Sequence, residues 1–411
     1  MQWIIDNKEW IFSGVGVFVL TLAVGVFIKK QFSSKQIQNS GSKSTNYQAG
    51  SDINIGTKDV IKDEVQKQEG GDSSTNLQGK NITINQGISY SDAKDIALDV
   101  YKINFLQLSQ DAAQTARERA EEITDNFLGK LKKENESAID SMNEPSMQAA
   151  LYEAQKQYAK TGDKDLEGLL VDILVERAST PERSIHQIVL DESLSVASKL
   201  TAEQMDALTI NFLITQTSNT DLTNLPALSN YIQTNLVPFI GNLSKESSCY
   251  EHLEYVGCGS VMHVGGINQI ENIYQAQYGG LFSKGFTRER LEKELENPDA
   301  YPDLIANNLH DPSLLQINAV SLDGINEKCE KNNVPGLIKQ KIINLFNSTI
   351  MRPQEIKSYL IELSPDIEPL FDLWVDSQLS KFGLTTVGIA IAQANFRRKT
   401  GIKLDLSIWV K

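Results

Sequence analysis

Cysteine, histidine and positive charge are all scarce in this sequence of 411 residues. Three cysteines (Cys249, Cys258 and Cys329) are too few for a disulfide framework, so we expect a reducing compartment around the folded part. Four histidines leave few candidates for histidine-dependent catalysis. The formal net charge of −14 argues against a broad basic surface for non-specific binding of duplex DNA. A small basic pocket for a short anionic ligand remains compatible with this charge.

Several catalytic motifs are also absent. No GxxxxGK[ST] loop occurs, which argues against a P-loop motor or switch. HExxH and GxSxG are missing as well, and with them the commonest metalloprotease and serine hydrolase signatures. Acidic pairs such as Glu121-Glu122 are best interpreted as solvated helix faces. The sequence therefore predicts a protein that is not an enzyme and uses no cofactor.

One long hydrophobic run is present near the N-terminus. Residues 11–28 read IFSGVGVFVLTLAVGVFI without a charge, and about 27 Å of helix would match the bilayer core. Trp10 precedes the run, and Lys29, Lys30 and Lys35 follow it, which predicts that the C-terminal side faces the cytoplasm. A basic start and a small-residue cleavage site are missing, so we expect a retained anchor rather than a signal peptide. The sequence predicts a single-pass membrane protein.

Small residues within this span permit close contact between membrane helices, although no strict GxxxG is present. Two interpretations remain open, namely self-association through the span or the general abundance of glycine in membrane helices. If several copies line a pore, we expect Gly14, Thr21 and Gly25 to face it.

A polar stretch over residues 31–88 follows the N-terminal segment 1–30. It contains two similar passages, STNYQAGSDINI at 44–55 and STNLQGKNITIN at 74–85. Each ends in alternating Ile-polar-Ile, which predicts short strands. Because one such rung cannot bury a face, we expect several chains to meet here in an oligomeric stalk. The alternative is a flexible polar linker with a chance similarity.

Helical periodicity dominates from residue 89 onward. Ser89 to Asp92 form a capping box, and the apolar spacing continues to about Lys133, which predicts one long oligomerising helix within segment 89–140. Segment 141–411 predicts a helical, ligand-sensing cytoplasmic domain. Further helices are expected over 145–161, 166–178, 181–199, 201–216, 224–243, 287–296, 335–347, 354–362 and 366–381. Residues 403–410 alternate like a strand, so the predicted fold class is mainly α with a minor C-terminal strand.

Two basic clusters stand out in this acidic chain. Arg397, Arg398 and Lys399 close an apolar segment, and Lys284 and Arg288 flank the glycine-rich residues 279–286. Guanidinium groups beside exposed backbone amides bind phosphate, so both clusters are candidate ligand-binding sites. The alternative is that cations in a last helical turn only complement the helix dipole.

A third candidate is the set Cys249-x2-His252-x5-Cys258-x4-His263. These four residue types are zinc ligands, but their spacing matches no standard finger, and Cys258 lies in an apolar run that suits a core. Metal binding and a structural role both remain open, and we commit to no metal.

Several passages resemble a family of bacterial membrane proteins found among antiphage defence genes. They are SYSDAKDIALDVYKINF (89–105), HLEYVGCG (252–259), YGGLFSKGF (278–286), LTTVGIAIAQANFRRKTGIKLDLSIW (384–409) and the stalk passage NYQAGSDINI. The layout of anchor and soluble domain is similar to the membrane effectors of the Hailong defence system. This resemblance implies a homo-oligomeric ion channel in the lipid of the bacterial inner membrane, with its N-terminus outside. Its cytoplasmic crown domain would bind a single-stranded DNA oligomer, made by a partner nucleotidyltransferase, that keeps the channel shut.

The sequence leaves a second function open. A membrane-tethered scaffold or sensor could recruit a partner without forming a pore, and it would show the same anchor, stalk and helical domain.

Overall fold

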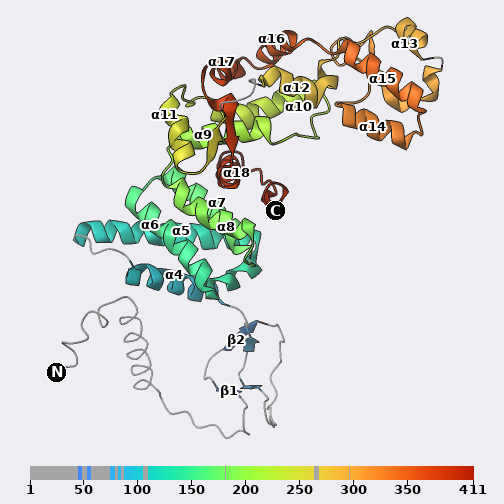
Figure 1. Cartoon of the computed structure of the whole chain (residues 1–411). Coiled ribbons are helices and arrows are strands. Elements are labelled where there is room, and N and C mark those ends of the chain that lie inside the picture. The colour runs from blue at the N-terminus through green and yellow to red at the C-terminus, as the bar shows by residue number, and fades with distance from the viewer. Residues whose placement is uncertain are drawn as a thin grey trace, which may run out of the picture. The chain divides into compact units, whose positions relative to one another are not determined.

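The structure is a computed structural model in which part of the chain is described. The described residues are 45–48, 53–56, 75–78, 82–84, 88–104, 110–180, 182–262, 268–295 and 297–411. Their contacts divide the chain into two units, Met1–Gly87 and Ile88–Lys411, and each is treated by itself below (Figure 1). The expected membrane span, with Gly14, Thr21 and Gly25, lies outside the described residues. Among those that are described, no helix combines the length and apolarity needed to cross a bilayer.

The first unit contains four short strands, and they confirm the strand prediction for the two repeats. The strands are β1 (Thr45–Gln48), β2 (Ile53–Gly56), β3 (Thr75–Gln78) and β4 (Ile82–Ile84). β1 pairs with β3 and β2 with β4, both in parallel. Identical residues are partners, as in Thr45↔Thr75 and Ile53↔Ile82. The repeats therefore lie side by side within one chain as two rungs.

Segment 89–140 contains two main helices rather than one, so the prediction of a single long helix was wrong. They are α4 (Tyr90–Asn104) and α5 (Gln110–Glu134). Lys94 Nζ lies 2.8 Å from Asp125 Oδ1, whereas one continuous helix would separate these residues by about 45 Å. The helices fold back on each other, which buries the apolar face of α4 within the same chain.

The rest of the second unit is also mainly helical (Figure 1). Its α-helices are α6 (Pro145–Thr161), α7 (Lys164–Ala178), α8 (Ile185–Ala197), α9 (Ala202–Thr215), α10 (Leu225–Tyr231), α11 (Ser247–Tyr255), α12 (Ile270–Tyr278), α13 (Arg288–Glu294), α14 (Leu322–Lys331), α15 (Gly336–Thr349), α16 (Pro353–Leu363), α17 (Glu368–Asp376) and α18 (Thr386–Thr400). Most coincide with expected segments. Two antiparallel pairs complete the unit, β5 (Gly259–Val261) with β8 (Phe382–Leu384) and β6 (Ile305–Asn307) with β7 (Leu315–Ile317).

The predicted C-terminal strand over 403–410 was wrong. Residues Leu406–Ile408 form a 3₁₀ turn, closed by the Asp405 carboxylate, which accepts a hydrogen bond from the Ser407 amide at 3.0 Å. The Trp409 indole donates to the carbonyl of Gln216 at 2.9 Å. The Gln393 side chain of α18 donates to the carbonyl of Leu404 at 2.6 Å, and no strand pairs with residues 403–410 within the part of the chain that the structure describes.

Helix α18 is the centre of the larger core. Its residues from Gly388 to Phe396 are all buried, and it packs against α7, α8 and α9. Gly388 is necessary for this packing, because a Cβ atom there would lie 2.0 Å from the carbonyl oxygen of Cys258. A smaller second core gathers around α13, α14 and α15. The buried helix α18 therefore ends in a charged turn that has to find partners inside the fold.

Candidate functional site

The last turn of α18 carries Arg397, Arg398 and Lys399. Gly401 ends the helix in the left-handed conformation, with φ 74°, and its amide donates to the carbonyl of Arg397 at 2.7 Å. Successive residues of a helix point about 100° apart, so the three side chains reach three different neighbours.

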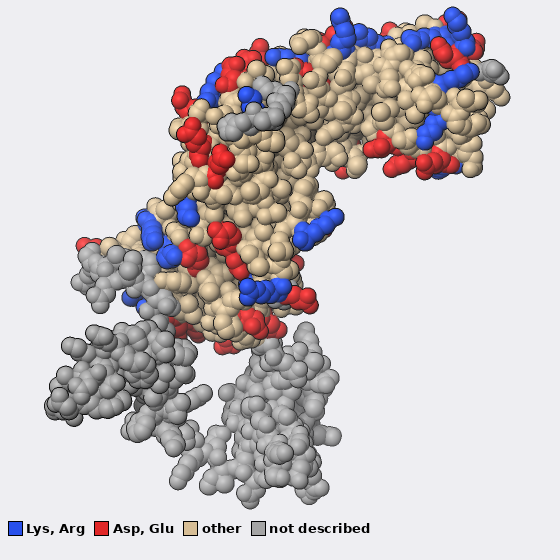
Figure 2. Space-filling model, viewed as in Figure 1, with Lys and Arg blue, Asp and Glu red and all other residues tan. Residues whose placement is uncertain are grey.

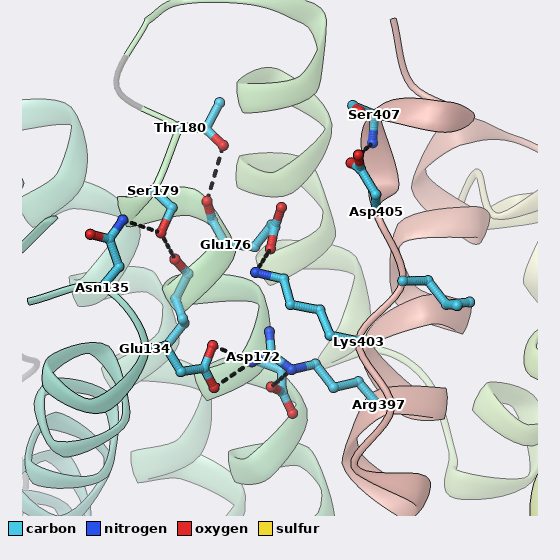
Figure 3. Close-up of polar contacts among 12 residues, drawn as sticks. Glu134, Asn135, Asp172, Glu176, Ser179, Thr180, Arg397, Lys403, Asp405 and Ser407 are labelled. Carbon is cyan, nitrogen blue, oxygen red and sulfur yellow. Dashed lines mark hydrogen bonds and ion pairs between the residues drawn. The ribbon is translucent and has the colours of Figure 1, made fainter.

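Arg397 lies between two carboxylates from different helices (Figure 3). Its Nε is 3.1 Å from Asp172 Oδ1 on α7, and its Nη2 donates to both oxygens of Glu134 at the end of α5. Lys130 of α5 donates to the same Asp172 carboxylate. Only 11% of the Arg397 side chain and 3% of the Asp172 side chain are exposed. This cluster joins α5, α7 and α18.

Burial raises the pKa of Asp172, and the neighbouring Lys130 and Arg397 oppose that shift. Both cations favour the charged form of this buried carboxylate. Removing one partner of a buried pair costs about 3–5 kcal/mol, because the other charge is left uncompensated. The first role of Arg397 is therefore structural.

Arg398 and Lys399 have similar internal partners. Arg398 donates to Asp165 and to the side-chain oxygen of Asn395, the latter at 2.9 Å. Lys399 Nζ lies 2.7 Å from Asp206, which is 2% exposed and also accepts a hydrogen bond from Asn395 at 3.0 Å. Each predicted ligand-binding cation of this run thus has a carboxylate within the fold.

An open hollow of about 680 Å³ borders this cluster. It is lined by Lys130, Glu134, Asn135, Ser179, Arg397, Gly401 and Lys403. Helices α5, α7 and α18 all end beside it, so their carbonyl ends add negative potential. Lys403, which is 51% exposed, pairs with Glu176 at 3.1 Å. The three cations that line the hollow, Lys130, Arg397 and Lys403, each contact a carboxylate, so an anion entering it competes with these carboxylates.

The Ser179 hydroxyl at the hollow is held by two hydrogen bonds within the fold. Asn135 Nδ2 donates to the Ser179 hydroxyl at 3.2 Å, and that hydroxyl donates to the Val175 carbonyl at 3.0 Å. The serine proton thus points to a backbone acceptor and not to a general base. Figure 3 shows these contacts beside the ion pairs of Arg397 and Lys403.

The second basic cluster lies beside the smaller core, near α13, which Figure 1 shows well away from α18. Lys284 pairs with Glu355 at 2.7 Å, and Arg288 pairs with Glu292 and Asp299, each at 2.8 Å. All five side chains are at least partly exposed. Figure 2 likewise shows acidic and basic residues interspersed over the visible face of the second unit, the body of the protein, without one continuous basic field.

The backbone amides near Lys284 are used within the fold. Gly280 donates to Val320 O at 2.8 Å, and Lys284 itself donates to Thr349 O at 2.8 Å. A Cβ at Gly280 would lie 1.8 Å from the Ala319 carbonyl oxygen, so this glycine serves close packing. The expected cradle of exposed amides is not formed by these groups, and a ligand role for Lys284 and Arg288 depends on their side chains alone.

Three of the four proposed zinc ligands are described, and His263 lies outside the described residues. Burial raises the pKa of Cys249 to about 11 and that of Cys258 to about 12. Both thiols are buried in the fold, where burial disfavours their charged form. His252 Nδ1 lies 3.0 Å from the Gln204 side chain. Within the described ranges, no group of three or more His, Cys, Asp or Glu side chains is placed to hold a metal.

The sequence interpretation missed the acidic partners of the basic run. Asp172 interrupts the apolar stretch LLVDILV, and Asp206 precedes ALTINFLI. A carboxylate inside an apolar helical run is a signal, because a buried charge requires a cation. Pairing these two acids with the basic run near residue 398 would have required knowing that α7 and α9 both pack on α18.

Comparison with known proteins gives a family for the second unit. A family model described only as “:-like” matches residues 87–410. The chain belongs to this family. Its description names no activity, ligand or partner. Neither a curated protein nor a solved structure matches the chain.

Proposed function

We propose that this protein is an oligomeric membrane effector of bacterial antiphage defence, an ion channel controlled by a nucleic-acid ligand on its cytoplasmic helical domain. The span over 11–28 would anchor it in the inner membrane, and the rungs would assemble it. The ligand would be a single-stranded DNA oligomer made by a partner nucleotidyltransferase. The resemblance of the sequence passages supports the defence role and the ligand class.

The proposal that several copies assemble is supported by the in-register pairing of β1 with β3 and of β2 with β4. Two parallel strands are too few to be stable alone, so this element favours contact with further copies. It comes directly between the apolar run and the helical domain. A change in the domain can therefore act on the anchor through a multimeric element.

The observation that supports ligand control is the ion-pair cluster of Arg397. A phosphate group that replaced Glu134 at the guanidinium would release the end of α5 from α18. Each charge-assisted hydrogen bond contributes about 1.5–3 kcal/mol. A shift from 1:99 to 99:1 between two states needs about 5.5 kcal/mol of differential affinity, which equals two to four such contacts made in one state and not in the other.

Purification of the full chain from bacterial membranes tests this proposal. We expect single-stranded nucleic acid to co-purify with the oligomer, visible in the ratio of absorbance at the nucleic-acid and protein maxima and in the mass of the complex. The Arg397→Lys variant keeps the charge but loses the planar donor fork, and we expect at least tenfold weaker retention. Lys132→Gln, which changes a 57% exposed side chain outside the cluster, is the matched control. Because the proposed ligand keeps the channel shut, preparations free of nucleic acid from cells in which the protein causes no growth arrest would contradict the ligand.

The alternative is a tethered scaffold or sensor that opens no pore. The exposed Lys403 and the mixed charges of the surface suit protein contacts as well as a ligand. Exchange of the span for an unrelated membrane helix separates the two functions. A scaffold keeps its activity after the exchange, whereas a channel loses growth arrest and dye entry.

A further inference from the structure

Each strand of the stalk has one unpaired edge. Within the described strands, β1 pairs only with β3, and β2 only with β4. The backbone N–H and C=O groups on the outer edges of both rungs are therefore free to pair with another strand.

The two rungs are near copies of each other. Partners within the chain are identical at Thr45↔Thr75, Asn46↔Asn76, Gln48↔Gln78, Ile53↔Ile82 and Ile55↔Ile84. Four residues separate β1 from β2 in the first rung, and three separate β3 from β4 in the second. The equivalent strands pair in spite of this difference in length. The rung that fits against β3 and β4 is thus one with the sequence of β1 and β2.

We propose that the free edges of β3 and β4 bind β1 and β2 of a second copy of this chain. The register repeats the one inside the chain, with Thr75 beside Thr45 of the next copy and Ile82 beside Ile53. A strand pair that forms within one chain can form again between chains, with the same residues and polarity, through the backbone groups of the outer edges. The occupant of the free edge is therefore another copy, and not an unrelated peptide.

This contact is head-to-tail, because β3 of one copy meets β1 of the next and all strands stay parallel. A heterologous contact of this kind does not close by two-fold symmetry. Each copy adds two rungs, or about 9–10 Å along the stack. Residues 29–44 can extend at most about 55 Å, so a shared membrane plane limits the stack to a few copies. This limit rests on the proposed anchor, whereas the strand pairing does not.

Disulfide cross-linking of two differently tagged full-length chains tests the register. One chain carries Thr45→Cys and the other carries Thr75→Cys, so a mixed species can form only between copies. Adjacent strands place these Cα atoms about 4.8 Å apart, within the range that a disulfide spans. The native thiols of Cys249, Cys258 and Cys329 are buried and do not compete.

The matched control replaces Thr75→Cys by Gln78→Cys, three residues or about 10 Å out of register. We expect at least tenfold less mixed species from this pair. A single chain with both Thr45→Cys and Thr75→Cys must also cross-link internally, which checks that the rungs form in the variants.

Three outcomes would overturn the proposal. Thr45→Cys alone could cross-link with itself as efficiently, which would indicate two-fold pairing of β1 edges. The pair with Gln78→Cys could give as much mixed cross-linked species as the pair with Thr75→Cys, which would contradict the proposed register. The internal link could form without any mixed species, which would show that the edges stay unpaired between copies. The cross-link does not depend on nucleic acid or ion flow, so its failure is distinct from failure of the proposed function.

Discussion

The Arg397 guanidinium contacts carboxylates of α5 and α7 from a position at the end of α18. Two of the three charges in this contact are almost completely shielded from water. A buried ion pair stabilises the fold only where its geometry is good. Removing one of its partners therefore lowers the free energy of unfolding far more than removing a surface pair does.

At this scale we predict that Arg397→Gln destabilises the body by about 3 kcal/mol, because Asp172 keeps only Lys130 as its cation. Thermal unfolding of the detergent-solubilised chain, followed by far-UV circular dichroism, measures the loss. Lys132→Gln removes an exposed pair with Glu136 and should change stability by less than about 0.5 kcal/mol. Equal melting temperatures for the two variants would contradict a structural role of Arg397.

Single residues of the site were only partly predictable from the sequence. The basic run was visible because it stands out in an acidic chain. Its neutralisation was not visible, because Asp206 and Lys399 are 193 residues apart and meet only through the packing of α9 on α18. Local spacing carries no information about such a contact.

Helix α18 depends on close backbone approach as much as on charge. Thr385 caps its first turn by accepting from the Gly388 amide at 3.2 Å, and the Thr385 amide donates to the Cys258 carbonyl at 3.0 Å. The helix is therefore fixed at its start against the strand β5 and at its end against α5, α7 and α9.

We predict that Gly388→Ala lowers the stability of the body by at least about 2 kcal/mol, since the new methyl group would overlap the Cys258 carbonyl. Gly129→Ala in α5 is the control, because a Cβ there meets nothing within 4 Å. This second change should stabilise by up to about 1 kcal/mol through helix propensity. The melting temperatures of both variants measure these changes in stability. An unchanged melting temperature for Gly388→Ala would contradict the packing described for α18.

At the element scale, periodicity predicted most helices but not where one helix turns back. The apolar spacing runs from residue 89 to about 133 without a glycine or proline before Gly129. Contacts between α4 and α5 hold the two helices against each other; for example, the Tyr101 hydroxyl donates to the Ala116 carbonyl at 3.1 Å. The alternation over residues 403–410 predicted a strand that does not form. Leu406 and Val410 are both buried, and their spacing of four residues places them on one side of a helical turn.

At the scale of the whole molecule, the charges that flank residues 11–28 predict the orientation of the proposed anchor. Lys29, Lys30 and Lys35 follow the apolar run, and the positive side stays in the cytoplasm. We therefore predict that protease added to spheroplasts leaves the Ile88–Lys411 unit intact. A tag at Met1 should be removed in the same experiment, and digestion of the body in unbroken spheroplasts would reverse the topology.

The central place of α18 has a consequence for the order in which the protein is made. Thr209 of α9 donates a hydrogen bond to the carbonyl of Ala392, which is 183 residues later in the chain. At a synthesis rate of about 5–20 residues per second, α9 leaves the ribosome about ten to forty seconds before its main partner exists. During that interval the apolar surface of α9 and the Asp206 carboxylate lack the helix that covers them in the finished fold. We therefore expect the apolar surface of α9 to become fully covered only after α18 has been synthesised.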